Sequence, residues 1–481
     1  MKSLSEITRA IRPKEKNLPF CMIEGLTANS NKVSKGDLFF AVRGKNIDGH
    51  DYIQNAIDAG ASAIISDSRD TRELSVPEVK VRNTRMALSK VASEYYGHPS
   101  KKLTVIGVTG TNGKTTTASI IKSILDEDGK KTAQIGTLGL IAEGVSHDIN
   151  LTTPDAISIQ ELFSKLLQAD FTHVVMEVSS HSLDQYRVLD VDFNIAVFTN
   201  LTPEHLDYHG TMKAYRKAKS RLFKMLNFDS IAVINKSDEY GDSISSFSSA
   251  PTVFFSLNES NYIHFENLQL NIDGIKGKIV TDKYSYVIKS KLIGDFNSEN
   301  ILAAVSVAHV LGINSDQIEN GTENCPLIEG RMETIKLNNH SIVVIDYAHT
   351  PDAYEKVFRT LKLLKSQNAK IYTVFGAGGD RDKKKRPKMA QIAENYSEHC
   401  FITPHNPRNE NPKTIANEIC NGFSKKNYTI FNDRKNGLVS AIKKANQFDI
   451  VAVFGKGRED YQVVNNKKLY HSDLKIIEEY I

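Results

Sequence analysis

The segment Leu103-Thr-Val-Ile-Gly-Val-Thr-Gly-Thr-Asn-Gly-Lys-Thr-Thr116 decides the fold of the chain. It begins with a β-branched run typical of a buried strand and continues into a glycine-rich turn. After the turn, apolar residues recur at helical spacing from Ala118 to Leu125, until Gly129. A strand, a glycine-rich loop and a helix in this order predict an α/β domain that binds phosphate.

The loop itself has the chemistry that phosphate binding requires. Glycines let backbone N–H groups converge on phosphate oxygens at a helix N-terminus, while Lys114 would neutralise terminal phosphates and the Thr115 hydroxyl would bind Mg²⁺. The common pattern G-x-x-x-x-G-K-[ST] is not fully met, because Val108 stands at its first glycine position. The flanking strand and helix disfavour the alternative of a glycine-rich turn with a surface lysine. The residues expected to bind the nucleotide here are Gly110, Thr111, Asn112, Gly113, Lys114, Thr115 and Thr116.

The chain around this segment is long and ordinary in composition. At roughly 150 residues per domain, 481 residues predict about three domains. A hydrophobic share of 40% and a charged share of 25% exclude a disordered or fibrous chain. With 61 Lys and Arg against 57 Asp and Glu, the net charge of +4 does not indicate a nucleic-acid or membrane partner. The four cysteines are far apart, and neither a secretory signal nor a membrane-spanning apolar run is found, so we expect a cytoplasmic protein.

Apolar runs and turn signals predict three α/β units with boundaries at residues 1–100, 101–328 and 329–481. The first boundary follows the turn-rich segment Tyr95-Tyr-Gly-His-Pro-Ser100. Between about Val253 and Leu292, short strands with turns such as Ile272-Asp-Gly-Ile275 predict a small antiparallel patch. The expected strands of the two later units are Val174–Met176, Ile195–Phe198, Ile231–Ile234, Ile342–Ile345, Ile371–Phe375, Cys400–Thr403 and Ile450–Phe454.

Chemistry-bearing residues follow two of the central strands. Glu177 lies at the end of an apolar run, where the carboxyl ends of parallel strands face a ligand crevice, and its carboxylate suits Mg²⁺. A strand-terminal surface acid is an equally good reading of its position. The next strand runs into a loop with His205, Asp207 and His209. A zinc site is weakened by the lack of cysteine partners, and clustered histidines are also found in structural roles.

Blocks along the whole chain resemble the Mur ligases, in the order that the family has them. The resemblance implies three α/β domains: a UDP-binding N-terminal domain, a central P-loop ATPase-like parallel sheet, and a Rossmann-like C-terminal domain. The blocks are Gly107–Thr116, Met176–His181, Phe198–Gly210, Gly294–Asn300, Gly330–Glu333, Asp346–Pro351, Gly376–Lys383, His405–Arg408 and Gly455–Gln462.

The resemblance implies an ATP-dependent amide ligase of peptidoglycan precursor synthesis. ATP would phosphorylate the D-glutamate γ-carboxylate of UDP-N-acetylmuramoyl-L-alanyl-D-glutamate, and the amine of a diamino acid would attack the acyl phosphate. A carboxylate is a poor electrophile, whereas an acyl phosphate carries a good leaving group, so this transfer needs mainly positioning and charge neutralisation.

Family positions assign roles to residues of the first two domains. Lys114, Glu177, His205 and Lys219 would be catalytic, with Thr115, Glu177, His205 and a carbamylated Lys219 holding Mg²⁺. Asn297, Arg331 and Asp346 would contact ATP, the last only when the domains close. The UDP-muramoyl dipeptide would meet Ser30, Lys45, Asn46, Ile47, Thr152, Thr153, Ser179, Gln185 and Arg187. The family's Asp-Ser-Arg reads Asn29-Ser30-Asn31 here, which removes one cation near the uridine.

The segment His405-Asn-Pro-Arg408 bears on the choice of amino acid. In the family, Asp-Asn-Pro-Arg marks enzymes for meso-diaminopimelate, whose distal carboxylate L-lysine lacks. Arg408 can pair with a carboxylate through two hydrogen bonds, although His405 replaces the acidic residue. Arginine also replaces the family's usual histidine in Gly457-Arg458-Glu459. The implied contacts to meso-diaminopimelate are Arg381, His405, Asn406, Pro407, Arg408, Gly455 and Glu459.

Other activities remain open alternatives. The same ligase could add L-lysine, and a folylpolyglutamate synthase-like ligase shares the ATP core but does not explain the N-terminal domain. A P-loop switch or nucleic-acid-dependent ATPase is a more distant possibility, and the basic run Arg381–Lys388 could be mistaken for a nucleic-acid patch. The position of this run inside a family motif favours a substrate-facing or solvated loop. We expect small-molecule substrates, no nucleic-acid or membrane partner, and a monomer.

Overall fold

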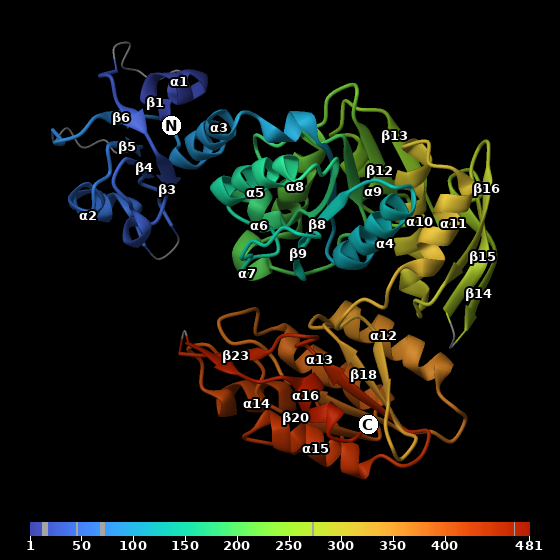
Figure 1. Ribbon diagram of the computed structural model, residues 1–481. Coiled ribbons are helices and arrows are strands. Elements are labelled where there is room, and N and C mark those ends of the chain that lie inside the picture. Colours follow the sequence, from blue (N-terminus) through green and yellow to red (C-terminus); the bar gives the residue numbers. More distant parts are fainter. Residues whose placement is uncertain (12–17, 45–46, 68–72, 272–273, 466) are drawn as a thin grey trace.

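A computed structural model describes residues 1–11, 18–44, 47–67, 73–271, 274–465 and 467–481. The chain forms three lobes, coloured blue, cyan to yellow, and orange to red (Figure 1). Lys45 and Asn46, expected near the uridine, and the first two residues of the expected turn Ile272–Ile275 lie outside the described residues. No helix in the described ranges combines the length and apolarity needed to cross a bilayer.

The N-terminal lobe is built on a four-stranded parallel sheet of order β3-β4-β5-β6. Its core contains apolar side chains of β4, β5 and α3, among them Leu38, Ile65 and Val91. A short antiparallel pair, β1 and β2, precedes the sheet. The strands are β1 (Lys2–Ser3), β2 (Met22–Ile23), β3 (Gly25–Thr27), β4 (Asp37–Phe40), β5 (Ala63–Ser66) and β6 (Glu78–Lys80), and the helices are α1 (Leu4–Thr8), α2 (Ile53–Asp58) and α3 (Thr84–Tyr96).

The central lobe has a seven-stranded sheet of order β13-β12-β11-β7-β10-β8-β9, in which only β9 runs antiparallel. The β-branched run after Leu103 forms β7 in the middle of this sheet. Such continuously apolar runs are typical of parallel strands that are covered on both faces. The strands are β7 (Thr104–Thr109), β8 (Thr132–Gly136), β9 (Gly139–Ile141), β10 (His173–Glu177), β11 (Ile195–Phe198), β12 (Ile231–Asn235) and β13 (Thr252–Phe255).

Helices cover both faces of the central sheet. Alternate residues of β7 explain this arrangement, because Ile106 and Val108 pack under α4, α10 and α11, while Val105 packs under α5 and α8. The helices are α4 (Lys114–Glu127), α5 (Ala156–Gln168), α6 (Ser180–Asp184), α7 (Leu206–His209), α8 (Met212–Lys224), α9 (Gly241–Ser245), α10 (Asp295–Val310) and α11 (Ser315–Asn324).

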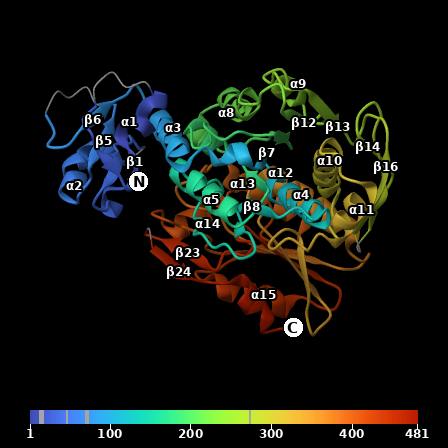
Figure 2. The ribbon, with the colours of Figure 1, turned by 45° about the horizontal axis from the view of Figure 1, so that its top comes forward.

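The predicted antiparallel patch is a separate three-stranded sheet of β14 (His264–Asn271), β15 (Gly274–Val280) and β16 (Ser285–Ser290). It lies beside α10 and α11, at the side of the central lobe away from the N-terminal lobe (Figure 2). The expected start of this patch near Val253 was wrong, because β13 pairs in parallel with β12 and extends the main sheet. Apolarity places Val253 in a strand without revealing which sheet that strand joins.

The C-terminal lobe has a six-stranded sheet of order β17-β18-β22-β19-β20-β21, parallel except for β17. The helices α12, α13 and α14 cover one face of this sheet, and α15 and α16 cover the other. The strands are β17 (Glu333–Lys336), β18 (Ile342–Asp346), β19 (Ile371–Phe375), β20 (His399–Ile402), β21 (Tyr428–Ile430), β22 (Ile450–Phe454), β23 (Tyr461–Val464) and β24 (Lys467–Tyr470). The helices are α12 (Pro351–Leu364), α13 (Lys385–Tyr396), α14 (Pro412–Cys420), α15 (Arg434–Lys444) and α16 (Asp473–Glu478).

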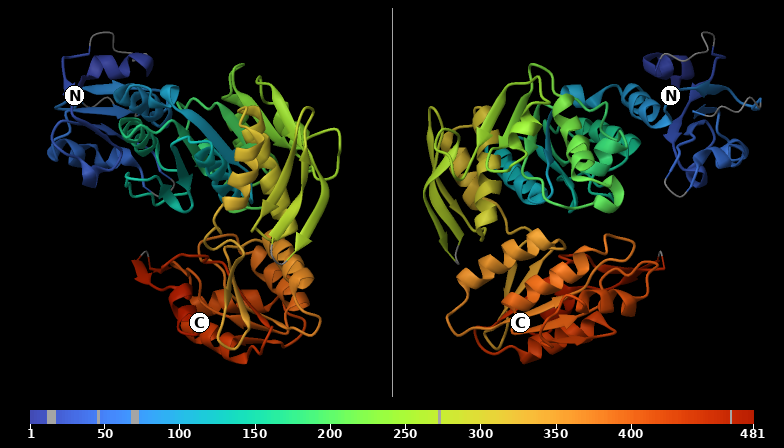
Figure 3. Two further views of the ribbon diagram at one scale, coloured as in Figure 1. Left: turned by 45° about the vertical axis from the view of Figure 1, so that its right-hand side comes forward. Right: turned by 180° about the vertical axis from the view of Figure 1, so that it is seen from behind.

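The central lobe contacts both of the other lobes. The helix α3 of the N-terminal lobe packs on α5, and α12 of the C-terminal lobe packs near α10. In two further views, the N-terminal and C-terminal lobes lie at different sides of the central lobe (Figure 3). The predicted three-domain α/β architecture is therefore confirmed, and the loop after β7 faces the C-terminal lobe.

Candidate active site

The glycine-rich loop after β7 folds around the ammonium of Lys114. The Nζ atom donates hydrogen bonds to the carbonyl oxygens of Gly110 and Thr111, at 3.0 and 2.8 Å. Burial lowers the pKa of Lys114, although the carboxylates of Glu177 and Glu204 partly oppose this shift. A cation with two backbone acceptors and two nearby carboxylates is held at the mouth of the loop.

The shape of the loop is fixed from the neighbouring strand end. The backbone N–H of Asn112 donates to Asn200 Oδ1 at 2.9 Å, and Thr199 Oγ1 donates to the Asn112 carbonyl at 2.7 Å. Gly113 begins helix α4 at φ +86°, a conformation that favours glycine, and a Cβ there would collide with the carboxamide of Asn300. Within the described ranges, no side chain caps the start of α4, and its first residues, Lys114 to Thr116, line a cavity.

The hydroxyl of Thr115 and the carboxylate of Glu177 meet directly in front of the loop. Thr115 Oγ1 donates to Glu177 Oε1 at 2.9 Å, and the backbone N–H of Thr137 donates to the same oxygen at 2.8 Å. Glu177 lies at the end of β10, as expected, and it is buried, so it is not the surface acid that its position in the sequence equally allowed. A hydroxyl and a carboxylate beside a phosphate loop are oxygen donors that fit Mg²⁺, which takes its other ligands from water and phosphate.

Lys219 comes from helix α8 and reaches the same loop carbonyl, that of Gly110, as Lys114 does. Its side chain is fully buried, and Nζ donates to the Gly110 carbonyl at 2.6 Å. Burial and then the neighbouring charge of Lys114 lower the pKa of Lys219 well below its ordinary value. An amine with a lowered pKa is neutral more often than a surface lysine, and a neutral amine is the nucleophilic form.

Three histidines gather next to this lysine, on α6, α7 and the loop before α7. The ring of His181 lies 4.8 Å from that of His205 and 5.5 Å from that of His209. Burial lowers the pKa of His205 to about 3 and that of His181 to about 4. Both imidazoles are therefore neutral at pH 7, which leaves a ring nitrogen able to bind a cation. His205 is also held at φ +55°, an unusual conformation for a residue with a side chain.

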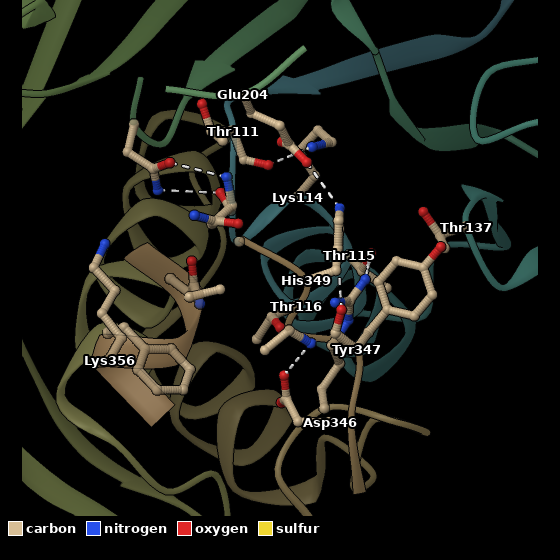
Figure 4. A pocket seen from close by; sticks show the side chains of 18 of the residues that line it. Thr111, Lys114, Thr115, Thr116, Thr137, Glu204, Asp346, Tyr347, His349 and Lys356 are labelled. Carbon is tan, nitrogen blue, oxygen red and sulfur yellow. Dashed lines mark hydrogen bonds and ion pairs between the residues drawn. The ribbon is translucent and has the colours of Figure 1, made fainter. Parts of the chain in front are cut away.

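A cavity of about 230 Å³ opens in front of the loop, between the central and C-terminal lobes. This P-loop cavity is lined from the central lobe by the loop itself, Glu177 and Ser179, and from the C-terminal lobe by Arg331, Asp346 and Tyr347. Figure 4 shows Asp346, Tyr347 and His349 facing Lys114, Thr115 and Thr116 across it. Arg331 Nη2 donates to Thr115 Oγ1 at 3.2 Å. Of the loop residues expected to bind the nucleotide, Thr111 to Thr116 thus share one cavity with the expected Arg331 and Asp346, whereas Gly110 does not line it.

Sequence reasoning missed the pair that bridges the two lobes beside this cavity. His349 Nε2 lies 2.8 Å from Glu204 Oε1. Burial alone would raise the pKa of Glu204, but the hydrogen bond and charge of His349 lower it well below its usual value. Both residues stand inside quoted motifs, Phe198–Gly210 and Asp346–Pro351, so motif membership could have indicated them. A second bridge runs from Asn112 Nδ2 to Asp352 Oδ2, at 2.9 Å.

Asn297 of helix α10, which was expected to contact ATP, does not line the P-loop cavity, whereas Asn300 of the same helix does. Asn297 orients Asn300, because its Oδ1 accepts a hydrogen bond from Asn300 Nδ2 at 2.9 Å. Residues of α10 and α12 that sequence reasoning did not single out also line this end of the cavity. They are Phe296, Glu299, Ala353, Lys356 and Val357.

A second cavity, of about 270 Å³, adjoins the first and is lined mainly by the C-terminal lobe. This Arg408 cavity shares Thr152, Glu204, His205, Tyr347 and His349 with the P-loop cavity. Of the residues expected to contact the amino acid, Pro407 is buried but does not line it. Those that do are Arg381, His405, Asn406, Arg408, Gly455 and Glu459, and Lys385 joins them without having been expected.

Hydrogen bonds set the orientation of the polar groups in the Arg408 cavity. Asn406 Nδ2 donates to Glu459 Oε2 at 3.0 Å, and Arg408 Nη1 donates to the Gly379 carbonyl at 2.8 Å. Arg408 lies at φ +52°, and its backbone is clamped by β23, because its N–H donates to the Val463 carbonyl at 2.9 Å. Burial and the nearby cation of Lys456 lower the pKa of His405 well below its ordinary value, so a neutral ring stands where the family has an acid.

The basic run Arg381–Lys388 is only in part the substrate-facing or solvated loop that we expected, with Arg381 and Lys385 lining the Arg408 cavity. Its last residues begin α13, and Arg386 is fully buried. Arg386 Nη1 donates to Glu410 at 2.9 Å and to Glu418 at 2.5 Å, while Nη2 donates to the Gly378 carbonyl at 2.9 Å. Arg386 thus connects the loop of Arg381 with the loop of Arg408. The sequence of a charged run does not reveal which of its residues is buried in this way.

The residues expected to meet the sugar peptide fall into two groups. Thr152 lines both cavities, and Thr153 and Ser179 lie beside Glu177 at the end of β10. Arg187 donates to the Thr153 carbonyl at 3.0 Å and to Gln185 at 2.7 Å, outside both cavities. Ser30 and the exposed Ile47 belong to the N-terminal lobe and line neither cavity.

Family models match most of the chain. "Mur ligase middle domain" matches residues 108–308, and "Mur ligase, glutamate ligase domain" matches residues 330–457. "Mur ligase family, catalytic domain" matches residues 22–96. The matches thus cover parts of all three lobes.

Individual relatives are similar over nearly the full length. The chain is 38% identical to a UDP-N-acetylmuramoyl-L-alanyl-D-glutamate–2,6-diaminopimelate ligase from Bacillus cereus, with 94% of this chain and 92% of the relative covered. It is 39% identical to the enzyme of that name from Aquifex aeolicus, with 95% and 93% covered. A solved structure of a ligase of that name superposes with a TM-score of 0.68 at 30% identity and covers 98% of each chain.

Proposed function

Because this chain belongs to the Mur ligase family, an ATP-dependent family that forms amide bonds, we propose that it adds meso-2,6-diaminopimelate to UDP-N-acetylmuramoyl-L-alanyl-D-glutamate. The relatives named for this reaction are similar over more than nine tenths of the chain. The observation that carries the proposal is the Arg408 cavity, where Arg408, Asn406 and Glu459 line a space that adjoins the P-loop cavity.

The reaction proceeds in two balanced steps. An oxygen of the D-glutamate γ-carboxylate attacks the γ-phosphorus of ATP, the bond to ADP breaks, and an acyl phosphate forms. The amine of diaminopimelate then attacks the acyl carbon, loses a proton and expels inorganic phosphate. Two adjoining cavities that share Thr152 and Tyr347 support this scheme, because the acyl phosphate must be reached from both sides.

The phosphate loop and its neighbours supply the charge that phosphoryl transfer requires. Lys114 and Arg331 would neutralise the γ-phosphate, and the N–H groups at the start of α4 would bind phosphate oxygens. Thr115, Glu177 and His205 would hold magnesium, which shields the phosphates and polarises the transferred group when bound. Asp346 fixes the strand end that carries Tyr347, since its carboxylate accepts from the N–H groups of Met332 and Ala348, at 2.8 and 2.7 Å.

We include a carbamate on Lys219 in the proposal. The neutral amine would add to carbon dioxide and lose one proton, which converts a cation into an anionic oxygen ligand. The burial of Lys219 and its lowered pKa support this reaction. An anion there also removes the repulsion between two lysines that face the same loop.

The remaining assignments follow the division of the chain into domains. We propose that residues 1–100 bind the uridine end through Ser30, Lys45, Asn46 and Ile47, that residues 101–328 bind ATP, and that residues 329–481 bind the amino acid. The muramoyl peptide would extend toward Thr152, Thr153, Ser179, Gln185 and Arg187. A cytoplasmic monomer fits this scheme, because ATP and UDP-sugars are cytoplasmic and one chain lines both cavities.

For the amino acid, a guanidinium in the Arg408 cavity favours meso-diaminopimelate over L-lysine. Arg408 would pair with the distal carboxylate that only meso-diaminopimelate has, and Glu459 would accept from the distal ammonium. Burial lowers the pKa of His405, so this position adds no anion to compete with the substrate carboxylate for Arg408.

Product formation tests the proposal directly. The protein is incubated with UDP-N-acetylmuramoyl-L-alanyl-D-glutamate, ATP and Mg²⁺, with meso-diaminopimelate and L-lysine in parallel, and the product mass and phosphate release are measured. We expect a tripeptide product with meso-diaminopimelate only. A product with L-lysine only would keep the ligase and overturn the role of Arg408, and no product with either would overturn the proposed function.

A further inference from the structure

Tyr347 lies where the two cavities and a third one meet. It follows Asp346 at the end of β18 and lines the P-loop cavity and the Arg408 cavity. It also lines an adjoining cavity of about 380 Å³ under the β23–β24 hairpin, next to Arg331 and Glu459. A single side chain therefore touches the space for the nucleotide and the space for the amino acid.

The ring of Tyr347 supports the arginine of the P-loop cavity. The guanidinium carbon of Arg331 lies over the ring, 4.8 Å from its centre. From this position Arg331 donates to Thr115 at 3.2 Å. Stacking on an aromatic face orients a planar guanidinium and lowers its freedom to turn away.

The hydroxyl of Tyr347 reaches the carboxylate of the Arg408 cavity. Tyr347 Oη donates to Glu459 Oε1 at 3.4 Å, while Asn406 and the buried ammonium of Lys456 bind the other oxygen, at 3.0 and 3.2 Å. Glu459 is thereby held by three donors from three segments. Of these three donors, only Tyr347 also lines the P-loop cavity.

The backbone around Tyr347 is fixed as firmly as its side chain. Its N–H donates to the Gly330 carbonyl at 2.9 Å, one residue before Arg331. Its carbonyl oxygen lies 2.9 Å from His349 Nδ1, whose other ring nitrogen contacts Glu204 of the central lobe. Gly457, at φ +54°, packs its backbone against the ring, where a Cβ would come within 3.2 Å. The ring cannot move without moving either Arg331 or the loop of Glu459.

From these contacts we infer that Tyr347 is a positioning residue that couples the nucleotide cavity to the amino-acid cavity, acting through Arg331 on one side and Glu459 on the other. The inference rests on the proposed function for the identity of the two ligands. It predicts that each ligand binds more tightly when the other is present, since both hold the same ring in place.

Two variants separate the two contacts of Tyr347. Tyr347→Phe removes only the hydroxyl, so KM for diaminopimelate should rise about tenfold, as for a lost hydrogen bond to a charged group, while KM for ATP changes less than about twofold. Tyr347→Leu also removes the ring from Arg331, so KM for ATP should rise about fivefold as well. In a Glu459→Gln background, Tyr347→Phe should add little, because the partner is already altered.

Tyr354→Phe is the matched control in the same lobe. Its hydroxyl is buried and has no hydrogen-bond partner among the residues that the structure describes, so this change should leave both KM values unchanged. If Tyr347→Phe behaves like this control, or raises both KM values equally, the inference is wrong. If wild-type protein makes no product, the proposed function fails instead. Equilibrium binding of ADP then still tests the ring contact, because Tyr347→Leu should weaken it and Tyr347→Phe should not.

Discussion

At the scale of single residues, the two lysines that face the phosphate loop have different environments. Lys114 contacts two loop carbonyls at the cavity, whereas Lys219 is enclosed and contacts one. In the proposed function, Lys114 neutralises a phosphate and Lys219 gives up its positive charge when it forms the carbamate. Each role can be removed by one substitution.

Lys114→Ala should lower kcat by at least about a hundredfold, because it removes the ammonium that the loop carbonyls hold at the cavity, and developing charge in the transition state would lose that partner. Turnover is measured by phosphate release, and circular dichroism shows whether the fold is retained. Normal turnover in a folded variant would contradict the role of Lys114.

Lys219→Ala should abolish turnover in a way that added bicarbonate does not restore, because no amine remains to form the carbamate. Wild-type protein in ¹³C-labelled bicarbonate should give a carbamate signal by NMR that the variant lacks. Lys217→Ala, on the exposed face of the same helix, is the control and should keep both activity and signal. Near-normal activity of Lys219→Ala would show that no carbamate is needed.

Arg408→Ala should raise KM for meso-diaminopimelate about tenfold to a hundredfold, through loss of a charge-assisted pair with the distal carboxylate. KM for ATP should stay within about twofold, because Arg408 does not line the P-loop cavity. The two KM values are measured side by side. An equal rise in both would exclude a specific role in amino-acid binding.

At the scale of elements, a buried ion pair anchors the two loops of the C-terminal lobe that carry Arg408 and Glu459. Arg434 of α15 donates to Asp473 at the start of α16, at 2.7 Å, and also to Thr403 and to the Phe454 carbonyl. Thr403 and Phe454 immediately precede the two loops that carry Arg408 and Glu459. Removing one partner of a buried pair leaves an uncompensated charge.

Asp473→Asn should therefore destabilise the C-terminal lobe by about 3–5 kcal/mol at pH 7. Burial alone would raise the pKa of Asp473, but Arg434 and His471 lower it below its ordinary value of about 3.9. The carboxylate thus stabilises the fold above about pH 4, and this contribution is lost as the pH falls through the lowered pKa.

Urea unfolding followed by circular dichroism measures the free energy of unfolding, because the chain has no tryptophan whose fluorescence could be followed. The difference in this free energy between wild type and Asp473→Asn should have its full value at pH 7 and shrink below pH 4. Glu479→Gln, which breaks an exposed ion pair between Lys435 of α15 and the residue that follows α16, is the control and should cost less than about 1 kcal/mol. A gap that does not narrow in acid would contradict the assignment to the carboxylate.

Much of the fold is predictable from local sequence, and the reasons are visible in particular elements. The run after Leu103, the glycines and the apolar spacing up to Leu125 each favour the same strand, loop and helix, which is what β7 and α4 are. The pairing of strands is harder to predict from local sequence. Val253 was assigned to the wrong sheet because an apolar run does not reveal its neighbour. Arg386 was assigned to a substrate-facing or solvated loop because its acidic partners, Glu410 and Glu418, lie in later segments of the chain.

At the scale of the whole molecule, the cavities exist only because the central and C-terminal lobes are docked. Three contacts join them beside the phosphate loop: His349 with Glu204, Asn112 with Asp352, and Arg331 with Thr115. The two partners of each contact are between 145 and 240 positions apart in the sequence. Local pattern cannot identify such pairs, which explains why Glu204, His349 and Tyr347 were missed.

His349→Ala should weaken this docking, because it leaves the buried carboxylate of Glu204 without its partner across the lobes. We expect a larger radius of gyration in solution scattering and a fall of about tenfold in kcat/KM for ATP. Glu398→Gln, which breaks a surface ion pair with Lys370, is the control and should change neither quantity. Unchanged scattering together with normal kinetics would show that the bridge does not hold the lobes.

The left-handed backbone of Arg408 has an evolutionary consequence. At φ +52°, glycine or asparagine would sit with less strain than arginine, so a mutation to either would stabilise the loop while removing the guanidinium. Selection for stability and selection for substrate recognition therefore oppose each other at this one codon. In a lineage whose amino-acid substrate has no distal carboxylate, we expect Arg408 to be replaced before the surrounding fold changes.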